Sequence, residues 1–150
     1  MIRRLIQTNE DFSIIFLRLG LGVVFFAHGS QKLFGWFGGY GFSGTMNFFT
    51  GSLGIPALFA FLAIMAEFFG ALGLLFGLLT RLAAFGIATV MVVAVLMVHL
   101  QYGFFMNWSG KLQGEGIEYH LLVLAISIVL MINGGGRWSL DRLIANLNPV

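Results

Sequence analysis

The sequence predicts an all-α membrane protein, a bundle of four transmembrane helices in up-and-down order. Three observations predict this fold class. Hydrophobic residues make up 59% of the 150 residues, and charged residues only 9%, compared with about 25% in soluble chains. The mean hydropathy is +0.95. Apolar residues also gather into four long segments separated by polar or glycine-rich stretches. A domain of this length has too much surface to hide so many apolar side chains from water, so its solvent is expected to be lipid.

The four apolar segments match the roughly 17 to 25 residues that a transmembrane helix needs. Within a single domain over 1–150, the predicted spans are 12–34, 56–79, 81–103 and 117–133. Asn9 is expected to cap the first helix, with Glu10 and Asp11 in its first turn. Pro56 suits the first turn of the second helix. The third begins at Arg81, so the second and third are expected to form a tight hairpin.

Basic residues near the span ends predict the orientation, because cytoplasmic loops carry an excess of lysine and arginine. One side of the predicted bundle holds five of them and the other side two. The five are Arg3, Arg4, Arg81, Arg137 and Arg142, and the two are Lys32 and Lys111. This bias predicts that both termini are cytoplasmic.

Two connecting segments on the opposite side are rich in glycine and aromatic residues. The first has no charged residue between Lys32 and Glu67, and it is expected to fold back on the bilayer with a partial helix near 44–49. The second, 103–116, has the same character. Both are consistent with an aromatic belt at the membrane surface and with a lid over a ligand cavity.

The C-terminal segment predicts a short amphipathic helix at the cytoplasmic interface. Ser139 is its expected N-cap. Apolar side chains then recur at helical spacing, at Leu140, Leu143, Ile144 and Leu147, as in helices that lie in the plane of a membrane.

Charged and polar residues within the first span predict a face directed into the bundle. Arg18, His28 and Lys32 follow helical spacing together with Gly22 and Gly29. A charge facing lipid costs several kcal/mol by most estimates, so this face must contact other helices. The two glycines would allow a neighbouring backbone to approach closely.

Five residues are predicted to meet at one depth, beneath the aromatic segments, and to form a ligand site. They are His28, Lys32, His99, Glu118 and His120. Glu118 and His120 differ by about 200° around a helix, so at most one of them faces a cavity squarely. Each also has a simpler interpretation: Lys32 as an interface anchor, Glu118 as a solvated carboxylate, and the histidines as packing residues.

Glu67 is predicted to form a buried ion pair with Arg18. A carboxylate placed near mid-membrane must be neutral or paired, and Arg18 is the basic residue nearest to it in predicted depth. Gly70, Gly73 and Gly77 on the same helix would give the close approach that such a pair requires.

Composition excludes several classes of site. The net charge is +2 and the basic residues are scattered, so nucleic acid is not an expected partner. The chain has no cysteine, which excludes disulfides, thiolate metal sites and covalently attached haem. No metal site is predicted, and the bilayer is the expected surrounding.

In the order and spacing of these residues the chain resembles the DoxX family of small four-span membrane proteins. The resemblance covers nearly the whole chain and rests on Arg18-Leu19-Gly20-Leu21-Gly22, His28-Gly29-x-x-Lys32-Leu33-Phe34-Gly35, Glu67-x-x-Gly70, Gly77-Leu78-Leu79-Thr80-Arg81, His99, Glu118-Tyr119 and Ser139-Leu140-Asp141. It implies a multi-pass protein of the bacterial inner (plasma) membrane with a loose connection to redox chemistry. Most members have no assigned activity.

The favoured functional hypothesis is the membrane subunit of a quinone-linked oxidoreductase. His28, Lys32 and His99 could donate hydrogen bonds to a quinone, and Glu118 or His120 could exchange protons. Electrons would come from a partner redox subunit, so the chain alone is not expected to be an enzyme. A homo-oligomer is the alternative to such a partner subunit. Two other functions remain open: a scaffold or chaperone-like membrane protein, and a b-type haem protein with two histidine ligands. Haem is a less favoured cofactor than quinone.

Overall fold

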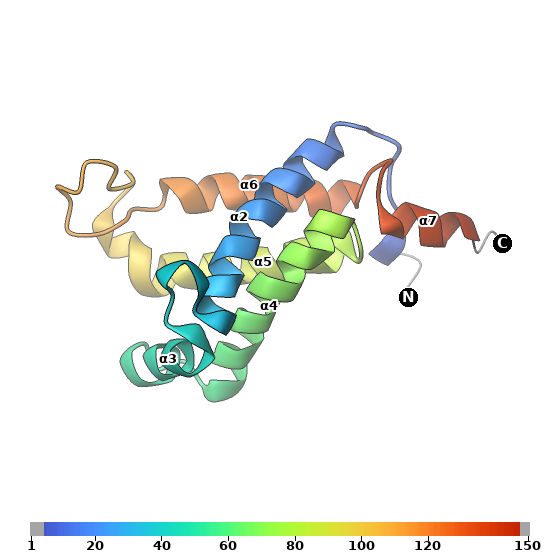
Figure 1. The fold of residues 1–150 in the computed structure, drawn as a ribbon. Coiled ribbons are helices and arrows are strands. Elements are labelled where there is room, and N and C mark those ends of the chain that lie inside the picture. The colour runs from blue at the N-terminus through green and yellow to red at the C-terminus, as the bar shows by residue number, and fades with distance from the viewer. Residues whose placement is uncertain (1–4, 148–150) are drawn as a thin grey trace.

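The computed structural model describes residues 5–147, and the described part of the chain is helical without strands. Figure 1 shows the arrangement. The α-helices are α2 (Ile14–Phe34), α3 (Gly41–Asn47), α4 (Ala57–Phe76), α5 (Thr80–Ala94), α6 (Glu118–Asn133) and α7 (Leu140–Leu147). Shorter turns are η1 (Trp36–Gly38), η2 (Phe48–Ser52), η3 (Val95–His99) and η4 (Leu100–Tyr102).

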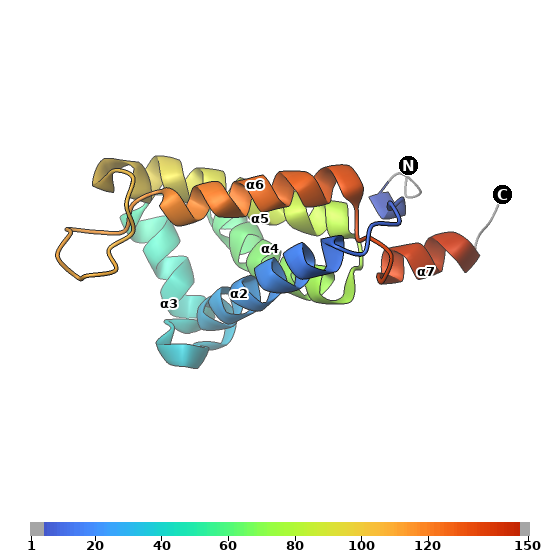
Figure 2. The ribbon, with the colours of Figure 1, turned by 90° about the horizontal axis from the view of Figure 1, so that it is seen from above.

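Three helices are long and apolar enough to cross a membrane: Ile14–Phe34, Ala57–Phe76 and Thr80–Tyr102. The last of these is α5 continued through η3 and η4. Helix α6 is apolar but shorter, with 16 residues, or about 24 Å at 1.5 Å per residue. It lies beside α5 in both ribbon views (Figures 1 and 2).

The helices form two antiparallel pairs, α2 with α4 and α5 with α6, that meet at one end and diverge toward the other (Figure 1). We call the end with the α4–α5 turn and α7 the closed end. The end with α3 and residues 103–117 is the open end. Divergence leaves space between the pairs at the open end, and this space positions the candidate site.

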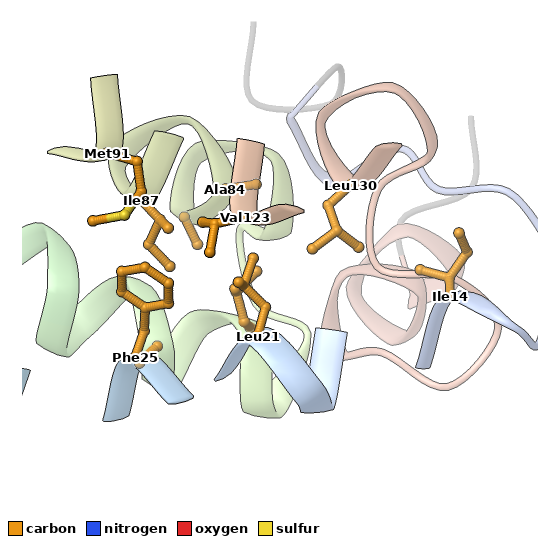
Figure 3. Packing of buried hydrophobic residues seen from close by; sticks show 11 residues of the cluster. Ile14, Leu21, Phe25, Ala84, Ile87, Met91, Val123 and Leu130 are labelled. Carbon is orange, nitrogen blue, oxygen red and sulfur yellow. The ribbon is translucent and has the colours of Figure 1, made fainter. Parts of the chain in front are cut away.

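The hydrophobic core lies where the pairs meet. Figure 3 shows the side chains of this cluster packed against one another. They include Ile14, Leu21 and Phe25 of α2, Ala84, Ile87 and Met91 of α5, and Val123 and Leu130 of α6, with Ala71 and Leu74 added by α4. Each of these side chains is at most 6% exposed. Large apolar side chains on the outer faces remain exposed, as expected of helices that contact lipid.

The start of the first helix differs from the prediction. Helix α2 begins at Ile14, and Asn9 is not its cap. The Asn9 side chain instead accepts from the Asp11 backbone N–H (3.0 Å) and donates to the Asn133 side chain (2.7 Å). Asp11 in turn accepts from the Ser13 backbone N–H (2.8 Å), which lowers the pKa of Asp11. The N-terminal residues are thus tied to the end of α6.

The predicted pairing of Arg18 with Glu67 is wrong, because Arg18 belongs to a different cluster at the closed end. It is 2% exposed and donates through Nη2 to the Trp138 backbone carbonyl (2.6 Å). Asp141, which is fully buried, supplies the opposite charge nearby. A Cβ added at Gly77 would lie 1.6 Å from Nη1 of Arg18, so only glycine fits there. Gly77 also ends α4 with φ +66°, a conformation that glycine adopts at little cost.

Asp141 holds the turn between α4 and α5. Its carboxylate accepts from the backbone N–H groups of Leu79 (2.6 Å) and Thr80 (2.9 Å), at the N-terminus of α5. An acidic group is favourable there because the first N–H groups of a helix have no partner within it. Leu79 has φ +48°, and these two bonds offset the strain of that conformation.

The short C-terminal helix predicted after Ser139 is present as α7. Ser139 Oγ accepts from the Arg142 backbone N–H (3.2 Å), the geometry of an N-cap. Leu140, Leu143 and Leu147 are exposed on α7. Helix α7 therefore presents apolar side chains that can contact the membrane surface.

Candidate functional site

A cavity of about 860 Å³ lies between the diverging helix pairs at the open end. Its walls come from α2, α4, α5, η3 and the start of α6, and Phe48, Phe49, Leu53 and Ile55 beside and within η2 contribute from the first connecting segment. Cavities of this size are typical of sites for organic ligands.

Seven ionisable side chains line this cavity. They are His28, Lys32, Glu67, His99, Glu115, Tyr119 and His120. The structure thus brings together four of the five residues predicted for a ligand site, from α2, η3 and α6. Glu118 and Arg18 do not line the cavity. Glu67, Glu115 and Tyr119 join it without having been predicted as ligand-site residues.

Lys32 and Glu67 form the ion pair that anchors the α2–α4 side of the cavity. Lys32 Nζ lies 2.6 Å from Glu67 Oε2, with side chains 24% and 4% exposed. Close approach of the helices makes this possible, because a Cβ added at Gly29 would lie 2.6 Å from the Cα of Phe68. Phe68 is the neighbour of Glu67 on α4, and Lys32 follows Gly29 by one turn of α2. The contact therefore brings Glu67 close to Lys32 and keeps it far from Arg18 at the closed end. The predicted close approach at Gly29 is confirmed.

The rings of His99 and His120 pack in a tilted contact on the α5–α6 side, with centroids 4.2 Å apart and planes inclined by 42°. Helix α5 widens into the π-helical turn η3, which ends at His99; such turns occur frequently at functional sites. His99 Nδ1 donates to the backbone carbonyl of Glu115 (2.8 Å). A carbonyl can only accept, so this bond fixes the proton on Nδ1 and leaves Nε2 of a neutral His99 as an acceptor.

Tyr119 and His120 each carry a buried polar atom that forms no hydrogen bond of good geometry with the described residues. The Tyr119 hydroxyl and His120 Nδ1 have no hydrogen bond within the described part of the chain, although the Gly116 backbone lies near the His120 ring. The rings of His28 and Tyr119 lie 6.4 Å apart. Buried polar groups are nearly always hydrogen-bonded, so these unpaired atoms beside a cavity favour a polar ligand.

Glu118 has a structural position. Its Oε2 accepts from the Met106 backbone N–H (3.1 Å), and Glu115 accepts in the same way from Asn107 (2.6 Å). These bonds hold the second connecting segment against the start of α6. Of the two residues between which the sequence left a choice, His120 lines the cavity and Glu118 does not.

The two aromatic segments contribute unequally to the walls. The partial helix predicted near 44–49 corresponds to α3 and η2, and Thr45 Oγ1 of α3 donates to the Lys32 backbone carbonyl (3.3 Å). Phe48 and Phe49 of the first segment line the cavity, and Met106 and Glu115 of the second do so too, whereas Phe105 and Trp108 are exposed and do not. No cluster of three or more His, Asp or Glu side chains suited to a metal ion occurs in residues 5–147.

Comparison with known proteins identifies the family. The DoxX sequence profile matches residues 13–100, more than half of the 150 residues. The chain belongs to the DoxX family. This match covers α2 to α5 and most of the cavity walls, and it leaves α6 with Tyr119 and His120 outside the matched region.

Three curated relatives align along most of the chain. "Putative oxidoreductase CatD" of Bacillus subtilis is 32% identical over 135 residues, covering 89% of each protein. "Inner membrane protein YqjF" of Escherichia coli is 28% identical over 135 residues, covering 90% of this chain and 94% of the relative. An uncharacterized membrane protein of Mycobacterium tuberculosis is 34% identical over 145 residues, covering 93% and 85%. No solved structure matches significantly.

Tyr119 is the cavity residue that sequence reasoning missed most clearly. It stands between Glu118 and His120, both of which drew attention because they are ionisable. Its phenol is a hydrogen-bond donor and acceptor. The available signal was the Glu118-Tyr119 pair in the family resemblance, which places the tyrosine at the start of α6.

Proposed function

We propose that this DoxX protein is the membrane subunit of a quinone-linked oxidoreductase system and that its cavity holds the quinone ring. The observation that carries the proposal is the unpaired Tyr119 hydroxyl beside His120 on the wall of an 860 Å³ cavity. A relative bears the name of a putative oxidoreductase, which supports a redox role.

The chemistry of the lining suits a quinone. Each carbonyl oxygen of the ring accepts hydrogen bonds, and the Tyr119 hydroxyl and the His28 and His120 rings can donate them from α2 and α6. Phe48 and Phe49 supply apolar surface for the ring. Reduction of the ring by two electrons takes up two protons, and histidines exchange protons readily near neutral pH.

The electrons are assigned to a partner protein. The chain has no cysteine and therefore no thiolate to ligate an iron–sulfur cluster. The partner would contact the cavity from the open end, where Glu115 and the second connecting segment lie. In this proposal the chain binds and orients the quinone, and the partner donates or accepts the electrons.

The proposal places the protein in the bacterial inner membrane with α6 as a fourth span and both ends on the cytoplasmic side. Arg81, Arg137 and Arg142 belong to the closed end of the fold, and Lys111 to the open end. Arg3 and Arg4 lie outside the described residues. A cytoplasmic reporter fused after Val150 and a periplasmic reporter at Gly110 should both be active. The reverse pattern would place the cavity on the cytoplasmic side.

Extraction of the purified protein tests the ligand directly. Protein purified from membranes in mild detergent should retain a quinone detectable by chromatography of a solvent extract. Tyr119→Phe removes one hydroxyl and should lower the retained quinone at least about fivefold, the factor expected for about 1 kcal/mol of hydrogen bonding. The matched control Tyr102→Phe lies outside the cavity and should retain quinone as wild type does.

Other outcomes of the extraction would favour the alternatives. A visible spectrum with haem bands in the purified protein would favour the b-type haem hypothesis. Folded wild-type protein that retains neither quinone nor haem would contradict the proposed function and leave the scaffold hypothesis in its place.

A further inference from the structure

The α4–α5 hairpin changes character along its length. Near the closed end the two helices are held together by small residues. A Cβ added at Gly73 would lie 3.1 Å from the Cβ of Ala83, and one added at Gly70 would lie 3.4 Å from the Ala83 carbonyl oxygen. The last such contact joins Gly86 to Ala66, at 3.3 Å. Beyond this contact the helices separate, as Figure 1 shows.

An apolar extension of the cavity begins beside Ala66 and Gly86 and continues into the gap beyond them. Its walls are Phe59, Leu62 and Ala63 of α4 and Phe85, Thr89, Val93 and Met97 of α5 and η3. Several of these side chains are largely exposed, among them Phe59 at 61% and Phe85 at 59%. A residue that both lines the cavity and faces outward marks a place where the cavity reaches the surface. In a membrane, lipid hydrocarbon chains contact that surface.

We propose that the ligand carries a hydrocarbon tail, that this tail lies between α4 and α5 beyond Ala66 and Gly86, and that the ligand enters sideways from the bilayer through this gap. The inference rests on the proposed quinone site and names the class of quinone: one with a long aliphatic or prenyl tail. The polar group would reach His28, Tyr119 and His120 while the tail remained in the extension.

Size and continuity support a tailed ligand. The polar and apolar parts form one cavity of about 860 Å³, near the upper end of the roughly 300–1,000 Å³ found for pockets that hold drug-sized ligands. A ring without a tail would leave the extension unfilled. An aliphatic chain gains far less from burial when it leaves lipid than when it leaves water. The tail therefore fixes the route and orientation of the ligand more than its affinity.

Charge favours a neutral polar group over a phospholipid. Lys32, the lysine that lines the cavity, is paired with Glu67 at 2.6 Å, and Glu115 adds a second carboxylate. Counting Lys32 as +1 and Glu67 and Glu115 as −1 each, these three lining residues sum to −1. A lipid phosphate would meet this net negative charge without a free cation to neutralise it. A quinone is uncharged and avoids that penalty.

Filling the extension should discriminate against tailed quinones. Ala63→Phe adds a ring from α4, and Thr89→Phe adds one from the exposed face of α5, so two independent variants guard against a folding failure of either. Leu58→Phe is the matched control, because Leu58 is 65% exposed on α4 and does not line the cavity. Binding of a benzoquinone with a decyl tail and of the same benzoquinone without it is measured in nanodiscs, with concentrations corrected for partition into lipid.

The expected result is a loss confined to the tailed ligand. Both filling variants should weaken binding of the decyl quinone at least tenfold and change binding of the tailless quinone less than twofold, and Leu58→Phe should change neither. Equal losses for the two quinones, or no loss with folded variants, would overturn the tail assignment while leaving the quinone site intact. Wild-type protein that binds neither quinone would overturn the proposed function itself.

Discussion

The Lys32–Glu67 pair should show an asymmetric and strongly coupled contribution to stability. At a separation of 2.6 Å, two unit charges attract by about 6 kcal/mol at an effective dielectric constant of about 20. Desolvation and side-chain ordering offset part of that attraction. Removal of one partner from a buried pair typically costs about 3–5 kcal/mol, because the other charge is left buried.

The two single variants should differ because the partners are buried to different degrees. Lys32→Met leaves the Glu67 carboxylate, whose side chain is only 4% exposed, and should lower the free energy of unfolding by about 3 kcal/mol or more. Glu67→Leu leaves Lys32, whose side chain is 24% exposed and can move toward the membrane surface. We expect about 1–2 kcal/mol for that change. The double variant should cost less than the sum by about 2 kcal/mol.

The assay is reversible unfolding in mixed detergent micelles, followed by helical circular dichroism for the wild type, both single variants and the double variant. Arg18→Met combined with Glu67→Leu serves as the control cycle, because Arg18 lies at the opposite end of the bundle. The losses of unfolding free energy from these two substitutions should add within about 0.5 kcal/mol. Additivity of Lys32 and Glu67, or coupling of Arg18 and Glu67, would refute the reasoning.

Two further predictions concern the helix contacts. Asp141→Ala should lower the free energy of unfolding by about 3–5 kcal/mol, because it removes the acceptor of two backbone N–H groups and the charge that faces a buried arginine. Asp141→Asn keeps one acceptor and should cost less. Equal melting temperatures for both variants and the wild type would contradict the assignment. Gly29→Ala should cost about 1–3 kcal/mol because its Cβ would lie 2.6 Å from the Phe68 backbone. At Gly20 an added Cβ meets nothing within 4 Å, so Gly20→Ala should be neutral or stabilising by up to about 1 kcal/mol. Similar losses of stability at both glycines would indicate that α2 does not tolerate alanine in general, and would contradict a specific contact at Gly29.

The misassigned ion pair shows where depth arithmetic fails. Counting about 1.5 Å per residue along the spans placed Glu67 near mid-membrane, with Arg18 somewhat deeper toward the cytoplasm as the basic residue nearest to it in depth. The structure pairs Gly29 with Phe68 and Gly22 with Leu75 across the two helices, so α4 extends well beyond the end of α2 at the open end. The offset arises from α3 and η2, which lie between the helices in sequence. Nothing in the composition of those segments reveals how far they displace α4.

The features that sequence did predict depend on local periodicity. On the predicted inward face of α2, Arg18, Gly22 and Gly29 are buried as expected, whereas His28 is exposed. The helix after Ser139 begins where its cap predicts. Long-range partners could not be predicted in the same way. Asp141 lies more than 60 residues along the chain from Leu79 and Thr80, whose backbone N–H groups donate hydrogen bonds to its carboxylate. Only the packing of α7 against the α4–α5 turn brings them together.

The positions of the buried charges explain why this fold can hold a cavity in a chain of 150 residues. At the closed end, Arg18 and Asp141 tie α2, α7 and the α4–α5 turn into one cluster with no room for a side chain at Gly77. At the open end, the Lys32–Glu67 pair joins α2 only to α4, and the His99–His120 contact joins α5 only to α6. These two contacts each strengthen one helix pair, and the rings of His28 and Tyr119, 6.4 Å apart, approach each other between the pairs. All six residues line the cavity between the pairs, so the contacts that hold each pair together also form the walls of that cavity.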